Sequence, residues 1–382
     1  MKKTIIVLMA LAGAASAVEY NYTGATEGWA ETKANWTNTE TNEQLATNND
    51  HFGQGGTNAS QITNGNTFNI NSGVTVKAGK NTGGFRGATI NVSNSSTLQT
   101  NTSGGLSTPN TINVTTGATL NIQSGATVAS GNINVTGANL KVGGTVTGAN
   151  VTLTSATVEV EGGSLTINKN VNGSTINVTS GTLTFGNDVK MKNVTVTADN
   201  TVLFAANAKA YWDNNSNNGP ITFNLKDNGK VAYNDIYFKT AGGADQPGWG
   251  GSLTLSANCS VGLLEGSGLI LQTRDLVTFN SLNNNATYGS KEALLANYIN
   301  GGSITLNGVE LTYSATGFDG ASLNAEDVGK YTFTLTDNAI QLQYVAYSQA
   351  ATAPETPAIP EPATATLSLL ALCGLAARRR RK

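Results

Sequence analysis

Two glutamates, Glu159 and Glu161, are the first candidates for a catalytic pair in this chain of 382 residues. In an extended strand, residues i and i+2 share a face about 7 Å apart, which lies within the range for the paired carboxyl groups of glycoside hydrolases. Such a pair could act as general acid and base. No neighbouring copy of the repeat supplies a third acid or an arginine beside them. We therefore favour the alternative, a solvated face with a salt bridge to Lys141.

His51 is the only histidine of the chain, so a zinc site or a Ser-His-Asp triad would have to include it. It has neither the ligand cluster nor the Gly-x-Ser-x-Gly context that those sites require. Of the two cysteines, Cys373 lies in the C-terminal apolar run, which leaves Cys259 alone in the body. We predict a surface or capping histidine and a buried cysteine, and no catalytic residue.

The segment 213–219 is similar to a calcium-binding loop, because oxygen-bearing side chains alternate along it. Its glycine comes one residue late, and the twelfth position is Asn224 where a calcium loop has glutamate. A polar turn is the better interpretation. We therefore predict no metal site and no cofactor.

Two tryptophans are candidate glycan contacts. Trp249 lies between Gly248 and Gly250, and an aromatic face without side-chain cover can stack on a sugar ring. Trp212, next to the Asn-rich segment, could do the same. The alternative for both is packing in a core or cap, which is the more common role of tryptophan.

An irregular repeat between residues 62 and 205 positions the two glutamates, Glu159 and Glu161. Apolar pairs two residues apart open successive copies, which start 22, 22, 21, 18, 25 and 18 residues apart: Phe68/Ile70, Ile90/Val92, Ile112/Val114, Ile133/Val135, Val151/Leu153, Ile176/Val178 and Val194/Val196. A second apolar pair follows most of them: Leu120/Ile122, Leu140/Val142, Val158/Val160, Leu183/Phe185 and Val202/Phe204.

This pattern predicts an all-β fold, a parallel β-helix (β-solenoid). Apolar residues two apart place one face of a short strand inward, and copies of about 20 residues bury that face only by stacking. We expect about seven coils, with Lys141 stacked on Glu159. The polar residue inside each first pair would form one outward ladder along the axis: Asn91, Asn113, Asn134, Thr152, Asn177 and Thr195.

The segments on either side of the repeat should close it. Residues 18–61, with Trp29 and Trp36, are predicted to form an N-terminal cap. Residues 206–346 lose the rhythm and predict an irregular β region, either further coils with a cap or a small sandwich. In that region we expect a strand over 303–313, a helix over 291–300 and a hairpin of 330–336 with 339–345.

The N-terminal 17 residues have the pattern of a secretory signal peptide. Two lysines precede an apolar stretch, and Ala15-Ser16-Ala17 forms a small-residue cleavage site before Val18. The expected partners are the Sec translocon and signal peptidase. No cysteine follows the cleavage site, so a lipoprotein is excluded.

The C-terminal end combines three segments in order. Residues 347–362 form a proline-rich linker, 363–377 an apolar run of 15 residues, and 378–382 a cluster of five cations. A helix over the run reaches about 22 Å against about 30 Å of hydrocarbon, a gap that snorkelling arginines and local thinning can close. We predict a transmembrane helix followed by a cytoplasmic basic tail, which places the body outside.

This arrangement resembles the PEP-CTERM sorting tail of Gram-negative bacteria. The family's Pro-Glu-Pro element corresponds to Pro360, Glu361 and Pro362, preceded by Ile359 where the family often has valine. The resemblance covers about the last 25 residues. It implies processing by an exosortase and a host that makes exopolysaccharide. The chain would be anchored in the inner membrane first, and then released to the outer surface or matrix.

Composition narrows the function of the body. Residues 18–362 keep 15 of the 22 basic and all 24 acidic residues, a formal net charge of −9, which argues against nucleic acid as a partner. We predict a non-enzymatic surface or extracellular-matrix protein or adhesin, similar in its repeat to autotransporter passengers. The alternative is a carbohydrate-active β-helix enzyme or a carbohydrate-binding protein that acts on exopolysaccharide.

Overall fold

The computed structural model describes most of the repeat region, residues 62–205. The described residues are 17–30, 32–45, 65–79, 85–102, 105–107, 109–187, 189–205, 209–213, 221–226, 228–232, 235–238, 249–250, 253–257, 269–278, 281–284, 304–306, 309–310, 313–336 and 338–347. The predicted signal peptide before Ala17, the helix over 291–300, and everything after 347 lie outside them.

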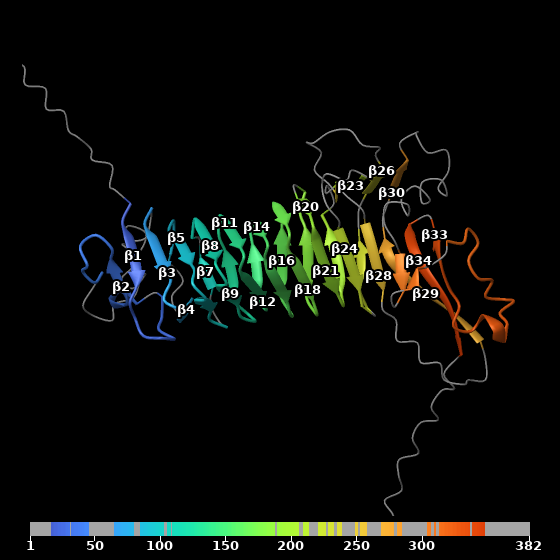
Figure 1. The fold of residues 1–382 in the computed structure, drawn as a ribbon, viewed down its shortest axis with the longest axis horizontal. Helices are drawn as coiled ribbons and strands as arrows, with labels where there is room; N and C mark the ends of the chain where they lie inside the picture. The colour runs from blue at the N-terminus through green and yellow to red at the C-terminus, as the bar shows by residue number, and fades with distance from the viewer. Residues whose placement is uncertain are drawn as a thin grey trace, which may run out of the picture.

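The chain winds into an elongated solenoid of three sheets that enclose one apolar core (Figure 1). Within the repeat, each coil adds one strand to each sheet, and strands of successive coils pair in parallel. The first sheet has 13 strands in this order: β2 (Trp36–Asn38), β1 (Glu19–Tyr22), β3 (Thr67–Ile70), β5 (Thr89–Val92), β8 (Thr111–Thr115), β11 (Asn132–Thr136), β14 (Asn150–Thr154), β17 (Asn170–Asn172), β20 (Lys190–Lys192), β27 (Trp249–Gly250), β23 (Lys209–Asp213), β26 (Asp235–Phe238) and β30 (Ser281–Asn284).

The other two sheets complete each coil. The second sheet has 11 strands: β4 (Thr75–Ala78), β6 (Thr97–Thr100), β9 (Thr119–Ile122), β12 (Asn139–Val142), β15 (Thr157–Val160), β18 (Thr175–Val178), β21 (Val194–Ala198), β24 (Ile221–Leu225), β28 (Leu253–Ala257), β31 (Ile304–Leu306) and β32 (Val309–Glu310). The third has 10: β7 (Gly105–Ser107), β10 (Thr127–Ala129), β13 (Thr145–Thr147), β16 (Ser164–Ile167), β19 (Thr182–Phe185), β22 (Thr201–Phe204), β25 (Lys230–Ala232), β29 (Leu269–Thr278), β34 (Ala339–Tyr347) and β33 (Tyr331–Leu335). Two short 3-10 helices, η1 (Lys33–Asn35) and η2 (Ala325–Asp327), are the helices of the described part.

Alternation of apolar and polar residues explains the strands. In β3, β5, β8 and β11 every second residue is buried, and the residues between are threonine or asparagine. Buried residues of successive coils stack into columns. One column in the first sheet runs through Ile70, Val92, Val114, Val135, Leu153, Val171 and Met191, all at most 3% exposed. β-branched side chains dominate it, as the pleated surface of a strand favours.

The solenoid prediction is confirmed. About six coils have all three strands, from β5 to β22, after a first coil with β3 and β4, against the seven that the repeat predicted. Lys141 and Glu159 are register partners in β12 and β15, as expected, and their Nζ and Oε2 atoms lie 2.9 Å apart.

The predicted register is wrong after the fifth copy. Ile176 and Val194 begin no first-sheet strand but belong to β18 and β21 of the second sheet, where Ile176 pairs with Val158. The first-sheet strands of those coils are β17 and β20, and each has a single buried residue between polar neighbours. Because neither strand has an apolar pair, the repeat pattern missed both and shifted by one strand.

The N-terminal segment extends the solenoid and covers its first coil. β1 pairs in parallel with β3, and β2 pairs antiparallel with β1. The Trp36 side chain is fully buried, with its ring centroid 5.0 Å from that of Phe68 and 6.0 Å from that of Phe85. Its Nε1 donates a hydrogen bond to Ala30 O at 2.6 Å, so the indole has a polar partner inside an aromatic cluster.

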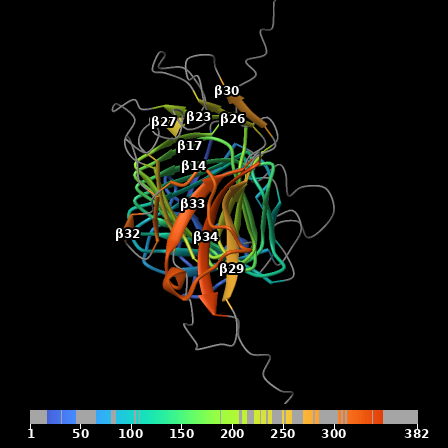
Figure 2. The same cartoon turned by 90° about the vertical axis from the view of Figure 1, so that its right-hand side faces the viewer.

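Further coils follow the repeat, the first of the two predicted alternatives. β24 and β28 continue the second sheet in parallel, and β25 continues the third. The predicted hairpin is confirmed as β33 and β34, and β34 also pairs antiparallel with β29. Figure 2 views the solenoid from this end, where these three strands face the reader.

Another prediction for this region is wrong. The strand expected over 303–313 is instead two short antiparallel strands, β31 and β32. The sequence between them, Asn307-Gly308, is a strong hairpin signal that the prediction overlooked.

Within the described residues no helix is long and apolar enough to cross a membrane. The predicted transmembrane helix over 363–377 lies outside those residues.

Candidate functional site

The two glutamates do not form an isolated carboxylate pair. Glu159 is half exposed and bridges to Lys141 on the neighbouring coil. Glu161 lies after β15, in the bend that follows Val160, and its N–H donates to Val142 O at 3.0 Å. The arrangement is the cross-coil salt bridge that the sequence favoured. Exposed pairs of this kind contribute about 0.2–1 kcal/mol.

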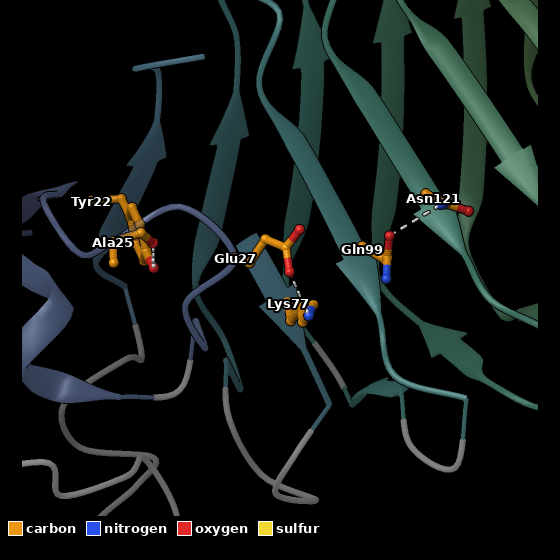
Figure 3. A network of polar contacts seen from close by, with 6 residues as sticks. All are labelled: Tyr22, Ala25, Glu27, Lys77, Gln99 and Asn121. Carbon is orange, nitrogen blue, oxygen red and sulfur yellow. Dashed lines mark hydrogen bonds and ion pairs between the residues drawn. The ribbon is translucent and has the colours of Figure 1, made fainter. Parts of the chain in front are cut away.

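This salt bridge belongs to a column of complementary side chains on the second sheet. The column runs through Lys77, Gln99, Asn121, Lys141, Glu159, Asn177 and Thr197. Figure 3 shows its beginning, where Lys77 Nζ lies 3.1 Å from Glu27 Oε2 and Asn121 Nδ2 lies 3.5 Å from Gln99 Oε1. Asn177, which the sequence placed in a ladder with Asn91, lies here instead. Opposite charges and amides on neighbouring coils stabilise parallel stacking.

The tryptophans proposed as glycan contacts are brought together by the backbone. Trp249 pairs with Trp212 and with Met191, and Trp212 pairs with Phe238. These register positions continue the column that Met191 and the buried residues of the preceding coils occupy. The side chains of Trp212 and Trp249 lie outside the described part, so glycan contact by them stays a prediction.

An asparagine ladder crosses four coils on the outer face of the first sheet. Nδ2 of Asn91 donates to Asn69 Oδ1, Asn113 to Asn91, and Asn134 to Asn113, each at 2.9 Å. Thr152 occupies the next register position. The predicted ladder is thus confirmed from Asn91 to Thr152, but Asn177 and Thr195 are not part of it, because both lie on the second sheet.

Glu19 forms the N-terminal end of this ladder. Nδ2 of Asn69 donates to Glu19 Oε1 and to Asn21 Oδ1. Each amide therefore donates toward the carboxylate, and hydrogen bonds aligned in this way polarise one another. Sequence analysis missed Glu19, because nothing in the repeat predicted that β1 would pair with β3.

A groove of about 530 Å³ lies over this ladder. Its lining consists of Glu19 and two polar rows, the ladder Asn69, Asn91, Asn113 and Asn134, and a second row of Asn71, Ser93, Thr115 and Thr136. The second row was not singled out from sequence. The signal for it was present, since Ser or Thr recurs two residues after Asn in Ile-Asn-Val-Ser/Thr at 90, 112 and 133.

Two tyrosines near the N-terminal end titrate abnormally. Burial raises the pKa of Tyr22 to about 12, and burial also raises the pKa of Tyr20. Tyr22 is 3% exposed and its hydroxyl donates to Ala25 O at 3.0 Å (Figure 3). Neither tyrosine lines the groove, so their role is in the stability of the N-terminal end.

Several predicted site residues fall outside the described residues. These are His51, Cys259, the segment 214–219 and the sorting motif Pro360, Glu361 and Pro362, whereas Ala17 and Val18 of the predicted cleavage site are the first described residues. Among the residues that the structure describes, no group of three or more His, Cys, Asp or Glu side chains could hold a metal ion.

Comparison with known proteins adds no assignment. No protein-family model, no curated protein and no solved structure matches this chain.

Proposed function

We propose that the protein is an exported structural protein of the cell surface or extracellular matrix, an adhesin or scaffold, delivered by its C-terminal sorting signal. The observation that carries this proposal is the order of segments at the C-terminus. A Pro-Glu-Pro motif precedes an apolar run and five cations. Exosortase would process the chain near Pro362 after signal peptidase has removed residues 1–17.

The body supports a structural role. Parallel coils with complementary polar columns form an elongated body, and the outward residues of strands such as β8 and β11 carry amides and hydroxyls. Among the described residues, Leu203 is the one large hydrophobic side chain that is exposed, which suits a protein displayed in water. The salt bridge of Glu159 with Lys141 accounts for the charge that first pointed to catalysis.

A pair of substitutions in the linker tests the sorting step. Glu361→Ala alters the Pro-Glu-Pro motif, whereas Glu355→Ala changes a glutamate that also follows a proline, six residues earlier in the same linker. We expect Glu361→Ala to accumulate as an unprocessed precursor in the membrane fraction of the native host. Glu355→Ala should be distributed as the unaltered protein is. Equal export of both variants would refute the sorting proposal.

The alternative is a carbohydrate-active or carbohydrate-binding protein, and the polar groove on the first sheet favours the binding form. Incubation of the exported protein with a panel of polysaccharides separates these functions. New chain ends would indicate an enzyme, retention without cleavage would indicate a glycan-binding protein, and neither would leave the scaffold or a protein-binding adhesin.

A further inference from the structure

The groove over β3, β5, β8 and β11 has the dimensions of a ligand site. At about 4.8 Å per coil, the ladder from Asn69 to Asn134 extends about 14 Å along the axis. The two polar rows lie about 7 Å apart across the strands. The volume of about 530 Å³ lies within the range for small-molecule and cofactor sites.

The ladder leaves hydrogen-bonding capacity for a ligand. A side-chain amide has two N–H donors and an oxygen with two lone pairs. The ladder uses one donor and one lone pair on Asn91 and on Asn113. One donor and one lone pair therefore remain on each amide, and the hydroxyls of Ser93 and Thr115 in the second row can both donate and accept.

This chemistry fits a hydroxyl-rich neutral ligand. A sugar hydroxyl is itself a donor and an acceptor, so it can pair with either row. Glu19 is the one ionisable side chain among the described residues that line the groove, and the processed body has a formal net charge of −9. Both would repel an anionic polymer.

The amide side chains of the groove are also held in place without a ligand. The amides hold one another at 2.9 Å across successive coils, so a ligand need not order them, and the entropy lost on binding is small. Polar groups that repeat from coil to coil suit a repeating chain better than a single compact molecule. We propose that this groove binds a segment of neutral polysaccharide lying along the solenoid axis.

The test uses the full-length protein, purified in mild detergent, in affinity electrophoresis through dextran, mixed-linkage β-glucan, galactomannan and, as an anionic probe, alginate. We expect at least one neutral polymer to retard the protein and alginate to have no effect. Retardation should not change between low and moderate salt, since the contacts are between neutral groups.

Two variants locate the site. Thr115→Trp fills the groove, and we expect at least a tenfold loss of affinity for the retained polymer. Thr166→Trp, at a half-buried outward position of β16 on the third sheet, is the matched control and should bind normally. Asn113→Thr is the second variant, because Thr152 already occupies the same ladder position two coils further on. It should keep the fold and lose at least threefold in affinity.

Retention by no neutral polymer, retention by alginate alone, or equal binding by the unaltered protein, Thr115→Trp and Asn113→Thr would overturn the proposal. These outcomes concern the purified protein and do not depend on sorting. If polysaccharide binding fails, the export proposal is unaffected. If the sorting proposal fails, the proposal of polysaccharide binding in the groove is unaffected.

Discussion

At the scale of single residues, Glu159 decides between a catalytic and a structural interpretation of the repeat. Its partner is Lys141 on the neighbouring coil, and both side chains are about half exposed. A charge held in this way is screened by solvent and contributes little to stability. Its position in a column of complementary side chains gives it a role in fixing the register of β12 and β15.

Glu159→Gln should therefore change the free energy of unfolding by less than about 1 kcal/mol. A double-mutant cycle with Lys141→Met should give a coupling energy of the same small size, measured by denaturant unfolding. A coupling of several kcal/mol, or loss of a polysaccharide-cleaving activity in Glu159→Gln, would contradict the structural interpretation.

Tyr22 gives the N-terminal end a sensitivity to alkaline pH. Its folded-state pKa, about 12, lies above the ordinary value of 10.0 because burial disfavours the phenolate. The stabilisation is therefore complete below pH 10 and is lost as the pH rises toward 12. We expect Tyr22 to account for a fall in stability of at most about 2.7 kcal/mol over that window, and Tyr22→Phe to reduce the dependence to the part that Tyr20 contributes. An unchanged pH profile in Tyr22→Phe would show that another group is responsible.

The sequence predicted some residues of the site and not others for a physical reason. Asn91, Asn113 and Asn134 follow from local alternation, because each lies between two buried residues of one strand. Glu19 reaches Asn69 from 50 residues away. That contact depends on the pairing of β1 with β3, and no periodic pattern in the sequence indicates it.

At the scale of elements, the turns between strands limit how closely the coils stack. Gly137 and Gly181 both have positive φ, +57° and +85°. A Cβ on Gly137 would meet nothing within 4 Å, whereas one on Gly181 would lie 2.2 Å from the backbone oxygen of Gly163 in the adjacent coil. At Gly137, only the left-handed backbone conformation favours glycine. At Gly181, the close approach of the adjacent coil's backbone also leaves no room for a side chain.

Gly137→Ala should cost about 1–2 kcal/mol, the penalty for a left-handed alanine. Gly181→Ala should cost more than about 3 kcal/mol, because the backbone of the adjacent coil must also move. Thermal and denaturant unfolding of both variants measure the difference. Equal effects would show that the coils near Gly181 pack less closely than described.

The first-sheet strands that the repeat missed show the limit of pattern reading. β17 and β20 carry one buried residue each, Val171 and Met191, between polar neighbours. They are strands because the coils before and after them provide backbone partners, not because of their own alternation. Tertiary context of this kind is absent from a local sequence window.

At the scale of the whole molecule, both ends of the solenoid have elements that differ from the repeat. β1 and β2 cover the first coil with the aromatic cluster around Trp36, and an antiparallel set of β29, β34 and β33 follows the last coils. Open sheet edges invite pairing with other chains. Elements of this kind at the two ends fit the proposed display of the body on a surface, and they leave its long outer faces for contact.

Export through the C-terminal signal is tested most directly by the mass of the protein recovered from outside the native host's cells. We expect intact-mass and terminal-peptide measurements to place the N-terminus at Val18 and the C-terminus near Pro362. The apolar run and residues 378–382 should be absent. An exported protein that still carries its arginine-rich C-terminus would contradict processing by an exosortase, and with it the proposed route to the surface.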